Sequence, residues 1–137
     1  MPNPPIDWEA LAQAAEAARA HAYAPYSGFA VGAAALFEDG AVSSGANVEN
    51  ASYGLGVCAE RNAVAAGVLA GHGRLRAVLV LSASARPVPP CGACRQVLVE
   101  FGAKELPVQS RTVAGAQSVR TLGQLLPEAF GPEWLGR

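Results

Sequence analysis

Three cysteines are the feature that most constrains how this 137-residue chain can fold. Cys91 and Cys94 form a C-x-x-C pair directly after Pro90, and Cys58 lies well upstream. An odd number of cysteines fits a disulfide framework poorly and fits a metal or catalytic site well. If all three share one site, the fold must bring Cys58 to the C-x-x-C pair.

The C-x-x-C pair permits three interpretations: half of a structural zinc site, a redox pair, or part of a catalytic metal site. A structural zinc site usually takes four protein ligands, and the remaining nitrogen or sulfur donors are Cys58, His21 and His72. His72 lies in a Gly-His-Gly turn, where solvent exposure is the simpler interpretation, and a redox pair leaves Cys58 unexplained. A catalytic zinc with three thiolates and an open position for water uses all three cysteines.

Glu60 follows Cys58 by two residues, near the expected start of a helix. At that spacing a carboxylate can lie beside a metal without binding it, and can carry protons between water and a leaving group. The alternative is an exposed glutamate in a first helical turn, where the helix dipole stabilises it. The nearby cysteines favour the catalytic interpretation.

Helix starts are also expected at Cys58 and Cys91, where backbone amides favour thiolates. Three thiolates on one Zn²⁺ leave a net charge of about −1, which would make the metal a weaker acid. Arg61 and Arg95, each adjacent to a cysteine in sequence, are therefore candidates to donate hydrogen bonds to sulfur. Either could instead be a solvated surface residue.

The hydrophobic pattern predicts helices alternating with strands. Helices are expected over residues 8–23, 58–70 and 91–101, with a short last helix that Thr121 caps and Pro127 ends. Strands are expected over residues 29–37, 41–48, 77–82 and 107–113, the first two joined by an Asp-Gly turn. This order suggests a single three-layer α/β domain over residues 1–137, with residues 1–5 as an extended tail.

Composition excludes several classes of function. Apolar residues make up 51% of the chain and charged residues 15%, which is typical of a globular protein. The net charge is −1 and no run of Lys and Arg exists, so nothing indicates binding to nucleic acid or anionic lipid. No segment reaches the roughly 18 apolar residues of a membrane helix. Residues 1–5 lack the features of a signal peptide, so we expect a cytoplasmic protein.

The motifs around the cysteines resemble those of the cytidine deaminase family. Cys58-Ala59-Glu60 and the segment from Pro90 to Cys94 match the Cys/His-x-Glu and Pro-Cys-x-x-Cys signature of zinc base deaminases. Having Cys as the first ligand is similar to the small, tetrameric members. The family's first-strand, nucleoside-binding and C-terminal signatures resemble residues 26–34, 45–53 and 125–130. One departure is Pro89, where the family often has a small hydroxyl residue, and it stiffens the approach to Cys91.

The resemblance implies an α/β/α fold with a mixed central sheet of about five strands. It implies a hydrolase that converts cytidine and deoxycytidine to uridine and deoxyuridine plus ammonia, in pyrimidine salvage. One zinc per chain would be held by Cys58, Cys91 and Cys94, with Glu60 as the catalytic proton carrier. The implied partners are a free pyrimidine nucleoside and three further copies of the chain, in a homotetramer with shared sites. No nucleic acid polymer or membrane is implied.

Roles for five residues that would contact the nucleoside in its own subunit follow from the same resemblance. Asn47 and Glu49 would bind the ribose 3′-hydroxyl, which suits two side chains that an extended segment points to one face. Phe29 would pack on the pyrimidine, because aromatic rings suit a flat base. The Ala59 amide would donate to the base O2, and the Pro90 carbonyl, left free by the turn, would accept from the amine.

Phe130 would enter the site of a neighbouring subunit, with Tyr53 near the same junction. An isolated phenylalanine is more often a core residue and an isolated asparagine more often a turn residue, so these roles depend on the resemblance. Two alternatives remain open: a deaminase of another aminated pyrimidine nucleoside, such as a nucleoside antibiotic, and a non-catalytic, zinc-stabilised interaction module. Glu60 separates the second alternative from an enzyme, since such a module needs no carboxylate beside an open zinc position.

Overall fold

The computed structural model describes residues 3–137 and contains, within that range, one mixed sheet of five strands. The strand order is β2-β1-β3-β4-β5. Only the β3–β4 pair is parallel, and the other three neighbouring pairs are antiparallel. The strands are β1 (Val31–Phe37), β2 (Val42–Ala46), β3 (Leu75–Ser82), β4 (Pro107–Thr112) and β5 (Gln117–Thr121). The expected mixed sheet of about five strands is confirmed.

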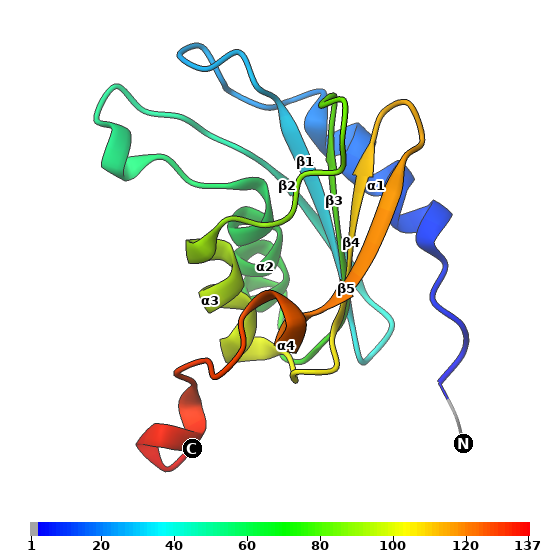
Figure 1. The fold of residues 1–137 in the computed structure, drawn as a ribbon, viewed down its shortest axis with the longest axis vertical. Coiled ribbons are helices and arrows are strands. Elements are labelled where there is room, and N and C mark those ends of the chain that lie inside the picture. Colours follow the sequence, from blue (N-terminus) through cyan, green and yellow to red (C-terminus); the bar gives the residue numbers. More distant parts are fainter. Residues whose placement is uncertain (1–2) are drawn as a thin grey trace.

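Helices cover both faces of this sheet, which gives the expected three layers (Figure 1). One face carries α1 (Trp8–Arg19), and the other carries α2 (Ala59–Leu69) and α3 (Gly92–Phe101), which contact each other. The short α4 (Leu122–Leu125) follows β5 and contacts α3. Two 3-10 helices, Tyr53–Leu55 and Pro132–Leu135, lie in the loop before α2 and near the C-terminus.

The alternation of side chains along β1 divides the core into two halves. Ala33, Ala35 and Phe37 belong to the apolar cluster that includes α2 and α3 residues. Ala34 and Leu36 belong to the cluster that includes Leu11 and Ala15 of α1. All five β1 side chains are buried, as expected for a strand covered on both faces.

Two glycines allow the helices to lie very close to the sheet. A Cβ atom on Gly32 in β1 would lie 2.0 Å from the carbonyl oxygen of Ala15 in α1. A Cβ atom on Gly45 in β2 would lie 2.5 Å from the backbone nitrogen of Ala63 in α2. Because only glycine fits at these distances, the backbones of α1 and α2 are held directly against the sheet. Gly45 thereby fixes the N-terminal half of α2, the element that follows Cys58.

The largest difference from the predicted element boundaries is at the end of the first helix. The first helix is capped by Asp7 as expected but ends at Arg19, before the predicted Tyr23. The amide of Tyr23 donates to the Asn47 carbonyl at 2.9 Å, and its carbonyl accepts from the Glu49 amide at 2.8 Å. This bridge draws Tyr23 out of the helix and places it against the 47–49 segment.

No strand was predicted at β5, because its residues are mostly polar and show no apolar alternation. The strand forms because it pairs in register with β4 after a tight turn through Gly115, whose φ is +106°. The Thr112 hydroxyl accepts from the Ala116 amide at 3.0 Å and closes that turn. Backbone pairing, not side-chain pattern, specifies this edge strand.

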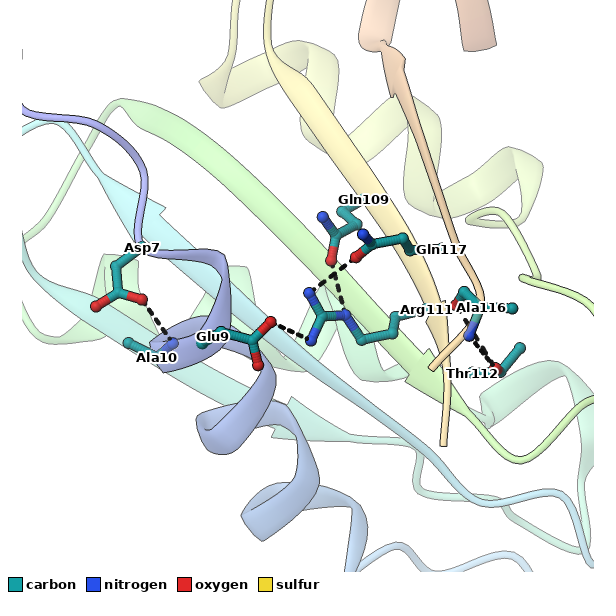
Figure 2. A network of polar contacts seen from close by, with 8 residues as sticks. All are labelled: Asp7, Glu9, Ala10, Gln109, Arg111, Thr112, Ala116 and Gln117. Atoms are coloured by element: carbon teal, nitrogen blue, oxygen red, sulfur yellow. Dashed lines mark hydrogen bonds and ion pairs between the residues drawn. The ribbon is translucent and has the colours of Figure 1, made fainter. Parts of the chain in front are cut away.

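Arg111 connects the β4–β5 edge to α1 (Figure 2). Its Nε donates to Gln109 Oε1 at 2.9 Å, and its Nη2 donates to Gln117 Oε1 at 3.0 Å. Its Nη1 donates to Glu9 Oε1 at 3.0 Å. Because Gln109 is only 3% exposed, the guanidinium satisfies a buried amide as well as bridging to the helix.

The two ends of the chain lie outside the sheet layers (Figure 1). Residues 3–5 of the predicted tail are exposed and have no regular secondary structure. Residues 1–2 lie outside the described range. Trp134 and Leu135 of the last 3-10 helix are both 70% exposed. None of the helices within residues 3–137 is long and apolar enough to span a membrane.

Candidate metal centre and substrate cavity

The fold brings the three cysteines together at the N-terminal ends of two neighbouring helices. Cys58 is the N-cap residue of α2, Cys91 is the N-cap residue of α3, and Cys94 lies in the first turn of α3. Their sulfur atoms all lie within 4.8 Å of one another. Cys91 Sγ lies 3.6 Å from Cys58 Sγ and 3.5 Å from Cys94 Sγ.

The chemistry of these three thiols fits a divalent cation. Hydrogen bonding from Cys94, with further donation from Arg61, lowers the pKa of Cys58 to about 5. The same contact with Cys58, together with burial, raises the pKa of Cys94 well above its usual range. Without a cation, therefore, only part of this cluster can ionise, because neighbouring thiolates repel. Zn²⁺ removes that restriction and binds three thiolates readily, so the donor set fits one zinc per chain.

The four-ligand alternative finds no support among the described residues. His72 Nδ1 lies 2.6 Å from Asp39 Oδ2 in the β1–β2 turn, and the His72 ring packs on Phe37. Among residues 3–137, the only group with metal-binding geometry consists of the three cysteines. The cluster therefore has the composition of a site with one position open to solvent or substrate.

Glu60 lies in the first turn of α2, two residues beyond Cys58, and is only 5% exposed. Burial is the main cause that raises its pKa above the usual value of 4.5, and the Cys58 thiolate adds to the shift. A buried carboxyl group beside a candidate metal site is suited to accept a proton and to return it to a bound ligand.

The two arginines next to the cysteines have different contacts. Arg61 Nη2 lies 3.6 Å from Cys58 Sγ and 3.2 Å from the Gly56 carbonyl oxygen, to which it donates. Arg95 instead donates from Nε to the Pro90 carbonyl and from Nη1 to the Leu125 carbonyl, both at 2.7 Å. Only the expectation that Arg61 donates to sulfur is therefore matched by the geometry.

A cavity of about 250 Å³ opens beside the sulfur cluster and Glu60. Seven residues singled out from the sequence line it: Phe29, Asn47, Glu49, Cys58, Ala59, Glu60 and Cys91. Pro89, noted above as a departure from the family pattern, also lines it, as do five residues to which the sequence assigned no role: Ser27, Val31, Val80, Ser82 and Val88. Ser27 could have been predicted as a site residue, because it stands in the same motif as Phe29. Val80 and Ser82 could not, because they line the cavity only as a result of where β3 lies in the folded sheet.

Three of the predicted substrate contacts do not line this cavity. Pro90 is fully buried and its carbonyl already accepts from Arg95, so this carbonyl is not left free by the turn. Tyr53, 80% exposed, lines a neighbouring cavity of about 350 Å³ that shares Ser27 and Glu49 with the first. Phe130 is 60% exposed and lines neither of these two cavities.

Asn47 and Glu49 are held by the segment before β1 and by the first residue of that strand. Asn47 Oδ1 accepts from the Val31 amide at 2.9 Å, and its Nδ2 donates to the Phe29 carbonyl at 2.8 Å. Glu49 Oε1 accepts from the amides of Tyr26 and Ser27 at 2.9 and 3.1 Å. The side-chain NH2 group of Asn47 has a second hydrogen that could be donated to a ligand in the cavity. The carboxylate of Glu49 can likewise accept a further hydrogen bond from such a ligand.

Comparisons with known proteins agree with this geometry. The family described as "Cytidine and deoxycytidylate deaminase zinc-binding region" matches residues 6–110. The chain is 48% identical over 134 residues to a cytidine deaminase of Mycobacterium tuberculosis, covering 98% of this chain and 97% of that protein. It is 46% identical over 128 residues to one from Halalkalibacterium halodurans, covering 93% and 97%.

Solved structures give the same result. A crystal structure of cytidine deaminase from Burkholderia pseudomallei superposes with a TM-score of 0.87 at 48% identity, covering 91% of this chain and all of that one. The cytidine deaminase from Bacillus anthracis superposes with a TM-score of 0.71 at 16% identity, covering 93% of this chain and 91% of that one, which bears on the fold alone.

Proposed function

Because the chain belongs to the cytidine and deoxycytidylate deaminase family, we propose that it hydrolyses the exocyclic amine of cytidine and deoxycytidine. The products are uridine or deoxyuridine and ammonia, and the general role is pyrimidine salvage. The observation that carries the proposal is a buried carboxyl, Glu60, beside the three-sulfur cluster in one cavity with Phe29 and Glu49.

Cys58, Cys91 and Cys94 are the residues that would hold the zinc ion. When bound, zinc supplies an activated water near neutral pH for attack at C4 of the base. Arg61 offsets part of the negative charge of the three thiolates through its contact with Cys58 Sγ.

Glu60 is the proton carrier in this proposal. It takes the proton that water gives up and delivers one to N3 of the base. It then takes a second proton from the hydroxyl group that has formed at C4, which becomes the carbonyl of the product, and delivers it to the leaving amine as the C4–N bond breaks. One water is consumed and one ammonia released, so protons balance over the cycle. The burial that raises the Glu60 pKa makes the carboxylate a stronger base than an exposed glutamate, which suits a group that accepts and returns protons.

The remaining cavity residues would orient the nucleoside. Phe29 packs on the pyrimidine, the Ala59 amide donates to the base O2, and Asn47 and Glu49 bind the ribose 3′-hydroxyl. The Pro90 carbonyl can contribute only through the lone pair that Arg95 leaves unused. Neither of the two cavities is lined by Lys or Arg among the described residues, which favours an uncharged nucleoside over a phosphorylated or polymeric substrate.

Assembly and location complete the proposal. The chain forms one domain, and four copies form a homotetramer in which Phe130 and Tyr53 reach the junction with a neighbouring site. The large exposed fractions of Tyr53, Phe130 and Trp134 support this, since these side chains gain burial only from a partner. The cytoplasm, where thiols stay reduced, suits the three-cysteine site. A light-scattering mass of one 14.0 kDa chain with full activity would contradict the shared site.

The decisive experiment follows the ultraviolet absorbance change when purified protein is incubated with cytidine. Wild-type protein is expected to turn over cytidine, and Glu60→Gln is expected to lose activity by about 10²-fold or more while keeping its zinc. Zinc content and thermal stability, measured on both proteins, separate loss of chemistry from loss of the site. No turnover by a wild-type protein that holds one zinc per chain would refute the proposed activity.

A further inference from the structure

The Glu49 carboxylate is held from across the cavity by the segment between α1 and β1. The amides of Tyr26 and Ser27 both donate to Oε1. The Ser27 hydroxyl donates to Oε2. This short loop therefore supplies three donors to one carboxylate, and the Ser27 hydroxyl is the only one of the three that a side-chain substitution can remove.

The same hydroxyl also contacts the residue expected to pack on the base. The Phe29 amide donates to Ser27 Oγ at 3.0 Å. A serine hydroxyl donates one hydrogen bond and can accept others through its lone pairs. It can therefore donate to Glu49 and accept from the Phe29 amide at the same time. Gly28, at a φ of +68°, and the bond from its amide to the Ala24 carbonyl shape the loop that makes this bridge possible.

The contacts of Glu49 leave one direction for a ligand. A carboxylate accepts about four hydrogen bonds, two at each oxygen. Oε1 accepts two amides and Oε2 accepts the Ser27 hydroxyl, so the remaining acceptor position belongs to Oε2. Glu49 and Ser27 both line the cavity that contains Glu60 and the cysteines.

We propose that Ser27 is a positioning residue for nucleoside binding, whose hydroxyl aims the free lone pair of Glu49 at a ribose hydroxyl and couples that aim to the position of Phe29. This inference rests on the proposed function, because it requires a nucleoside in the cavity. Ser27 has no assigned contact with the base or the reacting atoms, so its effect reaches the substrate mainly through Glu49.

The test compares two substrates that differ only where Glu49 acts. For Ser27→Ala with cytidine, KM is expected to rise about tenfold, since a hydrogen bond to a charged group is lost, while kcat changes less than about threefold. 3′-Deoxycytidine has no 3′-hydroxyl that could donate to Glu49. With this substrate the same substitution is expected to change KM less than about threefold.

Controls separate positioning from general loss of structure. Ser27→Thr restores a hydroxyl and is expected to recover most of the affinity for cytidine. Ser44→Ala removes an exposed hydroxyl from β2 and is expected to change neither constant. Because Ser27 is itself exposed, the alanine variant loses no core packing and should keep its zinc and its fold.

Direct binding of the products, measured by titration calorimetry, gives a second measurement that needs no turnover by the variant. The dissociation constant of uridine, but not that of 3′-deoxyuridine, is expected to rise in Ser27→Ala. An equal loss for both members of either pair, or a fall in kcat at constant KM, would overturn the inference. Absence of turnover in the wild-type protein would instead remove the proposed function, so the two failures are distinguishable.

Discussion

Arg61 Nη2 lies 3.6 Å from Cys58 Sγ, and the pKa of Arg61 is raised mainly by this contact with the thiolate. The Nε of the same guanidinium is buried without a hydrogen-bond partner. Burying part of an arginine in this way is costly unless it meets a negative charge. The contact therefore favours Arg61, over Arg95, as the cation that would balance a cluster of three thiolates.

Removing this cation should weaken zinc binding. We expect Arg61→Gln to lower zinc affinity about 10- to 100-fold, the range typical of partners that support a metal ligand. Competition with a colorimetric zinc chelator measures this directly, without using activity. Arg86→Gln is the matched control, because Arg86 is exposed. Equal zinc affinities in the two variants would show that Arg61 does not act on the metal site.

The choice between the two arginines could not be made from the sequence. Both Arg61 and Arg95 stand next to a cysteine, and both were equally able to donate to sulfur. The decision depends on where each guanidinium reaches after α2 and α3 have packed. The Arg95 guanidinium donates to the carbonyls of Pro90 and Leu125, which come together only in the folded chain.

Much of the fold was predictable where the signal is local. The Asp-Gly turn gave the β1–β2 hairpin, and Cys58 and Cys91 were recognised as helix starts from the segments that follow them. The end of α1 and the existence of β5 were not, because each depends on backbone pairing with a distant segment. The same holds for the Pro90 carbonyl, whose availability is set by Arg95.

Gly45 should be intolerant of any side chain. The Cβ of Gly45→Ala would lie 2.7 Å from the Ala59 carbonyl oxygen, so α2 must move. We expect a loss of at least about 2 kcal/mol in the free energy of unfolding, measured by chemical denaturation. Zinc affinity should fall as well, because Cys58 moves with the helix. Gly73→Ala is the control, since a Cβ there meets nothing within 4 Å and its φ is not positive. Equal stabilities would show that α2 can shift at no cost.

Arg111 and Glu9 form an ion pair whose two halves should differ in importance. Glu9 is 77% exposed on its side chain and Arg111 only 12%. Glu9→Gln should therefore cost less than about 0.5 kcal/mol, as exposed pairs do. Arg111→Met should cost about 2 kcal/mol, because it leaves the buried amide of Gln109 without its donor. Urea denaturation of the two variants tests the difference, and similar losses would mean that the ion pair, not the Gln109 contact, dominates.

Glu49 should titrate at a lower pH than an ordinary glutamate. The Ser27 hydroxyl is the main cause that lowers the pKa of Glu49 below the usual value of 4.5, and the amides of Ser27 and Tyr26 add to it. Hydrogen bonds to the ionised form favour that form, so removing the hydroxyl must raise the pKa. We expect Ser27→Ala to move the Glu49 pKa upward toward 4.5, and Ser44→Ala to leave it unchanged.

Carboxylate NMR of protein labelled with carbon-13 at glutamate measures this titration, with Glu49→Gln assigning the resonance. The linkage has a definite sign: a lowered pKa contributes stability that is fully present above 4.5 and is lost as pH falls through the folded-state pKa. The wild-type and Ser27→Ala proteins should thus converge in stability on acidification, never on alkalinisation. A Glu49 pKa that is identical in both would mean that the two backbone amides alone hold the carboxylate, and that Ser27 has no part in orienting it.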